Sequence, residues 1–128
     1  MDISWSPAYF EEDPFELSYS GNPFSAMVFV VTSVTFDDGS EISDGDVIGV
    51  FDGALCVGKG TWPLPQNNLV ASQDDGSGNG FGPGNQAYFK IWKDGSVRTV
   101  VEAPSQVFNG LDVQTVELTV YNLSLIHI

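Results

Sequence analysis

The sequence predicts an all-β protein, a single antiparallel β-sandwich of about seven to nine strands with an Ig-like or jelly-roll-like arrangement. Short apolar and β-branched segments recur at spacings of roughly 8–12 residues, as in sandwiches and barrels. Turn-forming dipeptides and glycine-rich stretches separate these segments, and none of them has a clear 3.6-residue period. The 128 residues are enough for one domain with its own core.

The clearest predicted element is a β-hairpin between Asp44 and Gly60. Apolar runs at 47–51 and 54–57 flank the dipeptide Asp52-Gly53. Asp-Gly favours a type I′ turn, because that turn needs positive φ at both central residues. Cys56 lies in the second run, so we expect a buried structural thiol there. As the only cysteine, it excludes a disulfide within the chain.

The remaining elements are expected on both sides of this hairpin. Residues 1–24 mix aromatic residues with three prolines and predict an extended lead-in whose aromatic side chains pack on the domain. The sandwich itself is expected over residues 25–122. Asp94-Gly95 is a second candidate for a type I′ turn. The other strands are predicted at 26–36, 68–72, 87–92, 96–103 and 113–121.

The last six residues, Leu123 to Ile128, need a separate interpretation. The peptide Leu-Ser-Leu-Ile-His-Ile is what the transposase end sequence used in preparing sequencing libraries encodes in frame. We therefore expect residues 123–128 to be adapter read-through from an environmental DNA assembly, and we leave them out of the functional argument. On this interpretation the natural protein continues beyond Asn122 and His127 is not native.

The charge balance excludes some classes of partner. Seventeen acidic residues against four basic ones give a formal net charge of −13, which repels nucleic acid and anionic lipid. No apolar stretch reaches the roughly 18 residues of a membrane helix. The first residues lack a basic region, so no signal peptide is visible. We expect neither nucleic-acid binding nor membrane insertion.

The inventory of catalytic residues is poor, and the sequence predicts that the chain is not an enzyme. His127 is the only histidine, and without it Ser-His-Asp and Cys-His arrangements cannot be assembled. Glu41, Glu102 or Glu117 could form a glycosidase pair. With seventeen acidic residues some such pairing is inevitable, so this pattern has little specificity.

One glycine-rich loop suggests a calcium site. Asp75, Ser77 and Asn79 place oxygen atoms at alternate positions before Gly80, as in the first half of an EF-hand loop, and Asp74 precedes them. The twelfth position holds Gln86, where an EF-hand has a bidentate glutamate. We therefore predict Ca²⁺ as a possible ligand of these four residues, with a solvated turn loop as the alternative.

Aromatic side chains could form a platform that stacks on sugar rings. Trp62 and Phe81 are the candidate ligand residues. Tyr88 and Trp92 share a strand face with Lys90 and are further possibilities. Burial in the core explains tryptophan in a sandwich equally well, and we favour it for Trp92.

Several ordered blocks of the chain together form a recognisable pattern. The blocks are 22–27, 45–53, 56–58, 71–72, 74–75, 80–81 and 89–92. They resemble a β-sandwich module of large secreted or cell-surface proteins of Bacteroidetes and related bacteria, many of them cargo of the type nine secretion route. The resemblance covers a little over half of the chain, and it departs from the family pattern at Lys93, which stands between Trp92 and Asp94. It implies an extracellular, non-catalytic domain within a longer protein.

These observations together predict a non-catalytic structural or interaction module of a cell-surface adhesin or fibre-like assembly, with calcium as a candidate stabilising ligand. The expected partners are neighbouring domains or copies of the same chain. The alternative is a carbohydrate-binding module of a secreted protein that acts on polysaccharides, with a glycan as partner.

Overall fold

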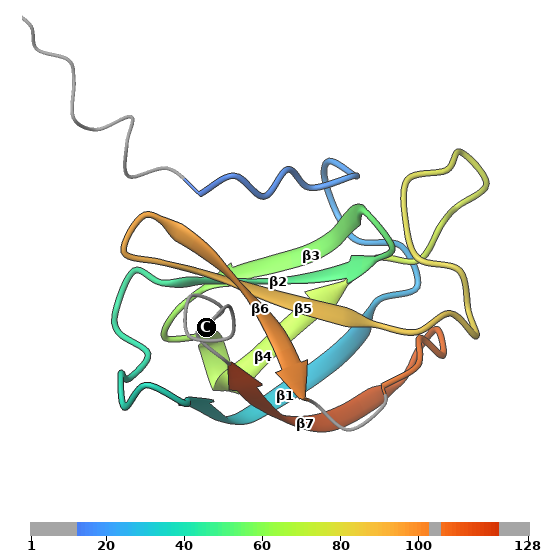
Figure 1. Cartoon of the computed structure of the whole chain (residues 1–128). Coiled ribbons are helices and arrows are strands. Elements are labelled where there is room, and N and C mark those ends of the chain that lie inside the picture. The colour runs from blue at the N-terminus through green and yellow to red at the C-terminus, as the bar shows by residue number, and fades with distance from the viewer. Residues whose placement is uncertain (1–12, 103–105, 121–128) are drawn as a thin grey trace, which may run out of the picture.

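The computed structural model of the protein describes residues 13–102 and 106–120. In this part of the chain, seven strands form two packed sheets, β3-β2-β5-β6 and β7-β1-β4 (Figure 1). The predicted β-sandwich is confirmed. The suspected read-through at 123–128 and the first half of the lead-in lie outside the described residues. The elements are β1 (Met27–Phe36), β2 (Val47–Asp52), β3 (Leu55–Thr61), the short 3-10 helix η2 (Pro65–Asn67), β4 (Asn68–Ala71), β5 (Tyr88–Lys93), β6 (Ser96–Glu102) and β7 (Val113–Val120).

Strand β6 belongs to both sheets. Its first half pairs with β5, and Val100 then pairs with Val120 of β7. On the other side of β7 lies β1, and these two strands are parallel over most of their length. This one pair differs from the wholly antiparallel arrangement that the sequence predicted. The reason is that strand direction between distant segments depends on the path of the chain and not on local residue pattern.

The two outermost strands, β3 and β4, meet and close the sandwich on the side opposite β6. The backbone N–H of Ser72 donates a hydrogen bond to the carbonyl of Val57 over 2.9 Å. Gly58 makes this close approach possible, because a Cβ atom there would overlap the carbonyl of Val70. The contact covers two strand edges that would otherwise be available for pairing with another chain.

The two predicted type I′ turns have different outcomes. Asp94 and Gly95 both have positive φ, at 54° and 79°, so the second prediction is confirmed. In the first hairpin Asp52 pairs with Leu55, which makes Gly53 and Ala54 the central residues. Only Gly53 has positive φ there, as in a type II′ turn. The hairpin exists, but its predicted turn type is wrong.

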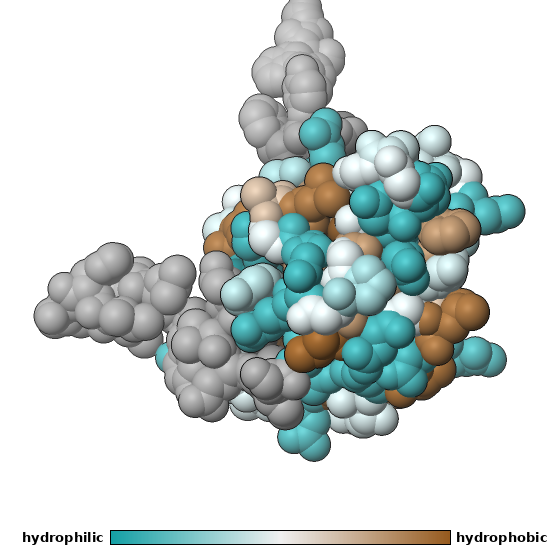
Figure 2. Space-filling model, turned by 90° about the vertical axis from the view of Figure 1, so that its right-hand side faces the viewer, coloured by the Kyte–Doolittle hydropathy of each residue, from teal (hydrophilic) through white to brown (hydrophobic). Residues whose placement is uncertain are grey.

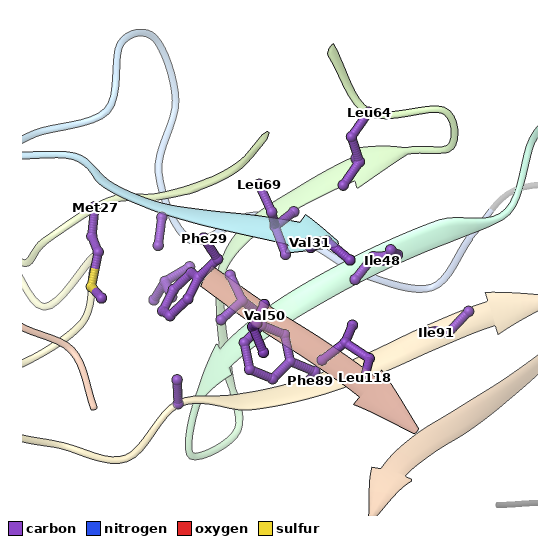
Figure 3. Packing of buried hydrophobic residues seen from close by; sticks show 14 of the residues in the cluster. Met27, Phe29, Val31, Ile48, Val50, Leu64, Leu69, Phe89, Ile91 and Leu118 are labelled. Carbon is purple, nitrogen blue, oxygen red and sulfur yellow. The ribbon is translucent and has the colours of Figure 1, made fainter. Parts of the chain in front are cut away.

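The main core fills the space between the sheets (Figure 3). Phe29 lies near its centre and meets Phe89 and Phe108 edge to face, at ring distances of 5.3 Å and 6.0 Å. Such pairs add to the stability that burial already provides. The predicted alternation in β5 is confirmed, since Phe89 and Ile91 point inward while Tyr88 is exposed.

A buried ion pair fixes the acidic turn that precedes β2. Lys93, at the end of β5, places its Nζ 3.1 Å from the Asp46 carboxylate and 3.2 Å from the Ser43 hydroxyl. Asp46 also accepts a hydrogen bond from the backbone N–H of Ser43. Both charged side chains are less than a tenth exposed. The two buried charges therefore have each other and nearby hydrogen-bond partners, without which their burial would be costly.

Candidate functional site

A second apolar cluster lies on the outer face of the four-stranded sheet. Side chains alternate along a strand, so Ile48 and Val50 enter the main core while Val47 and Phe51 point outward. Cys56 on β3 joins these two side chains, and the partly buried Trp92 packs against the cluster. The cluster is buried because a segment that precedes β1 covers it.

Phe15 is the side chain that covers this cluster, and Gly49 makes room for it. A Cβ atom on Gly49 would lie 3.1 Å from the Phe15 ring, closer than packed atoms normally approach. The Phe15 ring meets Phe51 edge to face with centroids 5.4 Å apart, and only 6% of Phe15 is exposed. A glycine inside a strand often marks such a close approach.

Polar contacts hold the backbone around Phe15. The Nζ of Lys59 donates to the carbonyl of Phe15 over 2.9 Å and lies 3.2 Å from the Asp13 carboxylate. Further along, the N–H of Ser18 donates to the carbonyl of Cys56 over 2.9 Å, beside a β-bridge that joins Leu17 to Cys56. Figure 1 shows this segment, in blue, running along β3. We call the surface formed by Val47, Gly49, Phe51, Cys56 and Lys59 the lead-in seat.

A hollow of about 450 Å³ lies beside the lead-in seat. Lys90 borders it and places its Nζ 4.6 Å from the centre of the Phe51 ring, a cation–π contact. Burial raises the pKa of the Cys56 thiol above its ordinary value, so this thiol is a poor nucleophile in the folded chain. The other residues that line the hollow are Pro14, Phe15, Glu16, Ala54, Leu55 and Val97.

The loop predicted to bind calcium is closed by its own hydrogen bonds. One oxygen of Asp74 accepts from the N–H groups of Gly76 and Gly78, over 2.9 Å and 2.8 Å. Asp75 accepts from the backbone and the hydroxyl of Ser77. The N–H of Asp75 in turn donates to the side-chain oxygen of Asn79. These bonds to carboxylates lower the pKa of Asp74 and of Asp75.

The four predicted residues carry enough oxygen atoms to begin a calcium site. Their side chains hold six oxygens, the lower end of the six to eight ligands that Ca²⁺ takes. Among residues 13–102 and 106–120, no three His, Cys, Asp or Glu side chains gather closely enough to hold a metal ion. Water molecules and backbone carbonyls could complete the shell of an ion bound there.

The structure separates the two aromatic residues predicted to bind sugar. Phe81 is fully buried and stacks on Phe108 with ring centres 4.4 Å apart, so its assignment to an exposed platform is wrong. An aromatic residue between glycines carries no local signal of burial, which is why the sequence did not reveal this. Trp62 is half-buried and packs on the edge of the main core.

The outer face of the three-stranded sheet carries a row of valines that the sequence analysis did not single out. Val70 of β4 lies opposite Val28 of β1, and Val28 lies opposite Val113 of β7. Val113 is exposed, and so is the neighbouring Leu111. The molecular face drawn in Figure 2 is mixed, with hydrophilic residues beside several separate apolar patches.

Comparison of the chain with known protein families, with curated proteins and with solved structures finds no match in any of the three. Within the described residues, no helix has the length and apolar character needed to span a membrane.

Proposed function

We propose that this chain is a non-catalytic structural or interaction module of a cell-surface adhesin or fibre-like assembly. The observation that carries the proposal is the lead-in seat. An extended segment with one aromatic anchor lies on the outside of a completed sandwich, and it joins β3 through a β-bridge. Strand addition with an anchoring side chain is a common way for β-domains to recognise extended chains.

The contact between segment and seat has the properties of a small protein interface. Phe15 is a desolvated aromatic anchor, and polar groups of Lys59, Asp13 and Ser18 surround it. Binding energy in protein interfaces concentrates in such anchors. The resemblance to secreted modules supports the extracellular location within this proposal.

Self-association is the measurement that tests the assembly part of this function. Sedimentation velocity over a wide concentration range should show association that grows with protein concentration. It should also grow with ionic strength, because salt screens the repulsion between copies that each carry a charge of −13. A chain that stays monomeric at high concentration and high salt would contradict the proposed assembly.

Calcium remains a proposal for the loop with Asp74, Asp75, Ser77 and Asn79. A metal that binds only the folded chain raises its melting temperature. Millimolar CaCl₂ should therefore raise the melting temperature, chelator should reverse the rise, and Asp75→Asn should abolish it. An Asp112→Asn variant, changed in another exposed loop, serves as the control. An unchanged melting temperature in calcium would end this proposal.

The carbohydrate alternative has less support than the interaction module. Of its two candidate residues, Phe81 is enclosed in the core and Trp62 is only partly accessible. A glycan screen with the native chain and with Trp62→Ala would decide it, since binding lost in a folded variant would favour a sugar site.

A further inference from the structure

We propose that the lead-in seat of one copy binds the segment Asp13–Ser18 of a second copy, so that copies are joined by exchange of this segment. This inference rests on the proposed function and specifies its partner. The occupant is defined by the structure itself, because this same segment fills the seat within one chain.

The contacts described at the seat lie between the segment and the sheet, and every copy carries both. The segment of one copy can therefore make the same contacts with the sheet of another copy. Phe15 fills the space above Gly49, its carbonyl accepts from Lys59, and Ser18 donates to Cys56. The exchanged complex therefore reproduces these contacts without requiring any new complementary surface. This is the reason that exchange of identical elements is an accessible route to oligomers.

The connection between this segment and β1 permits a change of direction. Ser20, Gly21, Asn22 and Pro23 are all exposed. Gly21 has φ of 75°, a value that a glycine adopts without strain. Phe24 stays tied to the domain, because its N–H donates to the Ser72 hydroxyl and its carbonyl accepts from the N–H of Gln73. The change of direction therefore falls in the exposed residues between Ser18 and Phe24.

The balance between closed and exchanged forms depends on concentration and salt. Within one chain the segment has a high effective concentration, on the order of millimolar for a short flexible link. Exchange between chains therefore becomes significant only where copies are crowded, as on a cell surface or in a fibre. Repulsion between the acidic copies weakens exchange at low ionic strength.

A disulfide test distinguishes exchange between chains from closure within one chain. The first chain carries Leu17→Cys together with Cys56→Ser, and the second chain keeps Cys56 as its only thiol. Leu17 and Cys56 form a β-bridge, so the introduced thiol lies close to Cys56 only when the segment occupies the seat. Because the first chain lacks Cys56, a disulfide with the second chain reports exchange. Leu17→Cys in the native background should form the bond within one chain and verifies the geometry.

The matched control replaces Leu17→Cys with Asn22→Cys, which puts a thiol in the exposed connection instead. At high concentration and salt, we expect at least ten times more disulfide-linked heterodimer from Leu17→Cys than from Asn22→Cys. Gly49→Leu in the second chain should remove this excess by filling the seat. Equal yields from the two thiol positions would overturn the inference, whether or not the Gly49→Leu variant folds.

Sedimentation of the unmodified chain separates failure of this inference from failure of the proposed function. Association together with equal yields from the two thiol positions overturns segment exchange and leaves the assembly function standing on another surface. A chain that remains monomeric and gives equal yields overturns both.

Discussion

Phe15→Ala should open the lead-in seat while leaving the sandwich folded. A buried phenylalanine removes roughly 150–250 Å² from water, and each Å² contributes about 25 cal/mol. Part of this surface stays covered in the released segment, so we expect a loss of about 3 kcal/mol. That loss corresponds to a roughly 100-fold increase in the equilibrium constant for opening.

Cys56 provides the assay for this opening. It is 4% exposed and lies beneath the segment, so a neutral thiol reagent should reach it when the segment leaves. The rate of Cys56 modification, measured in buffer where circular dichroism shows folded chain, should rise about 100-fold in Phe15→Ala. The main core lies between the sheets and does not contain Phe15, so its unfolding should stay cooperative.

Phe24→Ala is the matched control, because Phe24 is 48% exposed and follows the same segment without entering the seat. Its thiol reactivity should stay close to that of the native chain. A native rate in Phe15→Ala, or an equal acceleration in Phe24→Ala, would show that Phe15 does not hold the segment in place.

Three further variants test the fold in chemical denaturation. Gly58→Ala should destabilise the chain by about 2 kcal/mol or more, since its methyl group would overlap the Val70 carbonyl; native stability would refute the tight closure of β3 on β4. Lys93→Met should cost about 3–5 kcal/mol by leaving Asp46 buried without its partner, and adding Asp46→Leu should recover much of this; equal losses in the single and double variants would contradict the pairing. Hydrogen bonds from backbone N–H groups hold the pKa of Asp74 below its usual 3.8, so this group stabilises the fold above about pH 4 and the contribution is lost as pH falls. Asp74→Asn should therefore lose less stability than the native chain on acidification, and parallel acid curves would refute this.

Local sequence patterns predicted the strands well, because the alternation of side chains and the turn residues that limit a strand can both be read from neighbouring positions. Alternation of apolar side chains located β5, and positive φ at Asp94 and Gly95 formed the expected turn. The Asp52-Gly53 dipeptide misled the turn prediction for a physical reason. The register of β2 against β3 carries Asp52 into the strand and moves Ala54 into the turn.

The candidate site was less accessible from sequence, because it depends on contacts between distant segments. The aromatic lead-in was expected to pack on the domain, but nothing in its own residues indicated which surface would receive Phe15. Gly49 was the available signal, since a glycine within an apolar strand often marks the approach of another chain segment. Phe81 shows the converse case, in which a loop aromatic turns inward to meet Phe108.

The parallel pairing of β1 with β7 affects how the domain would respond to mechanical force. The chain enters β1 at Met27 and leaves β7 at Val120, and parallel strands place these two points at opposite ends of the pair. Tension applied through the flanking segments would therefore shear the two strands along their length. Residues 28–36 of β1 pair with β7 along the whole contact. Under shear, the hydrogen bonds along this contact carry the load together and do not break one at a time. Forced unfolding is governed by the unfolding rate, and we expect this arrangement of the load to lower that rate.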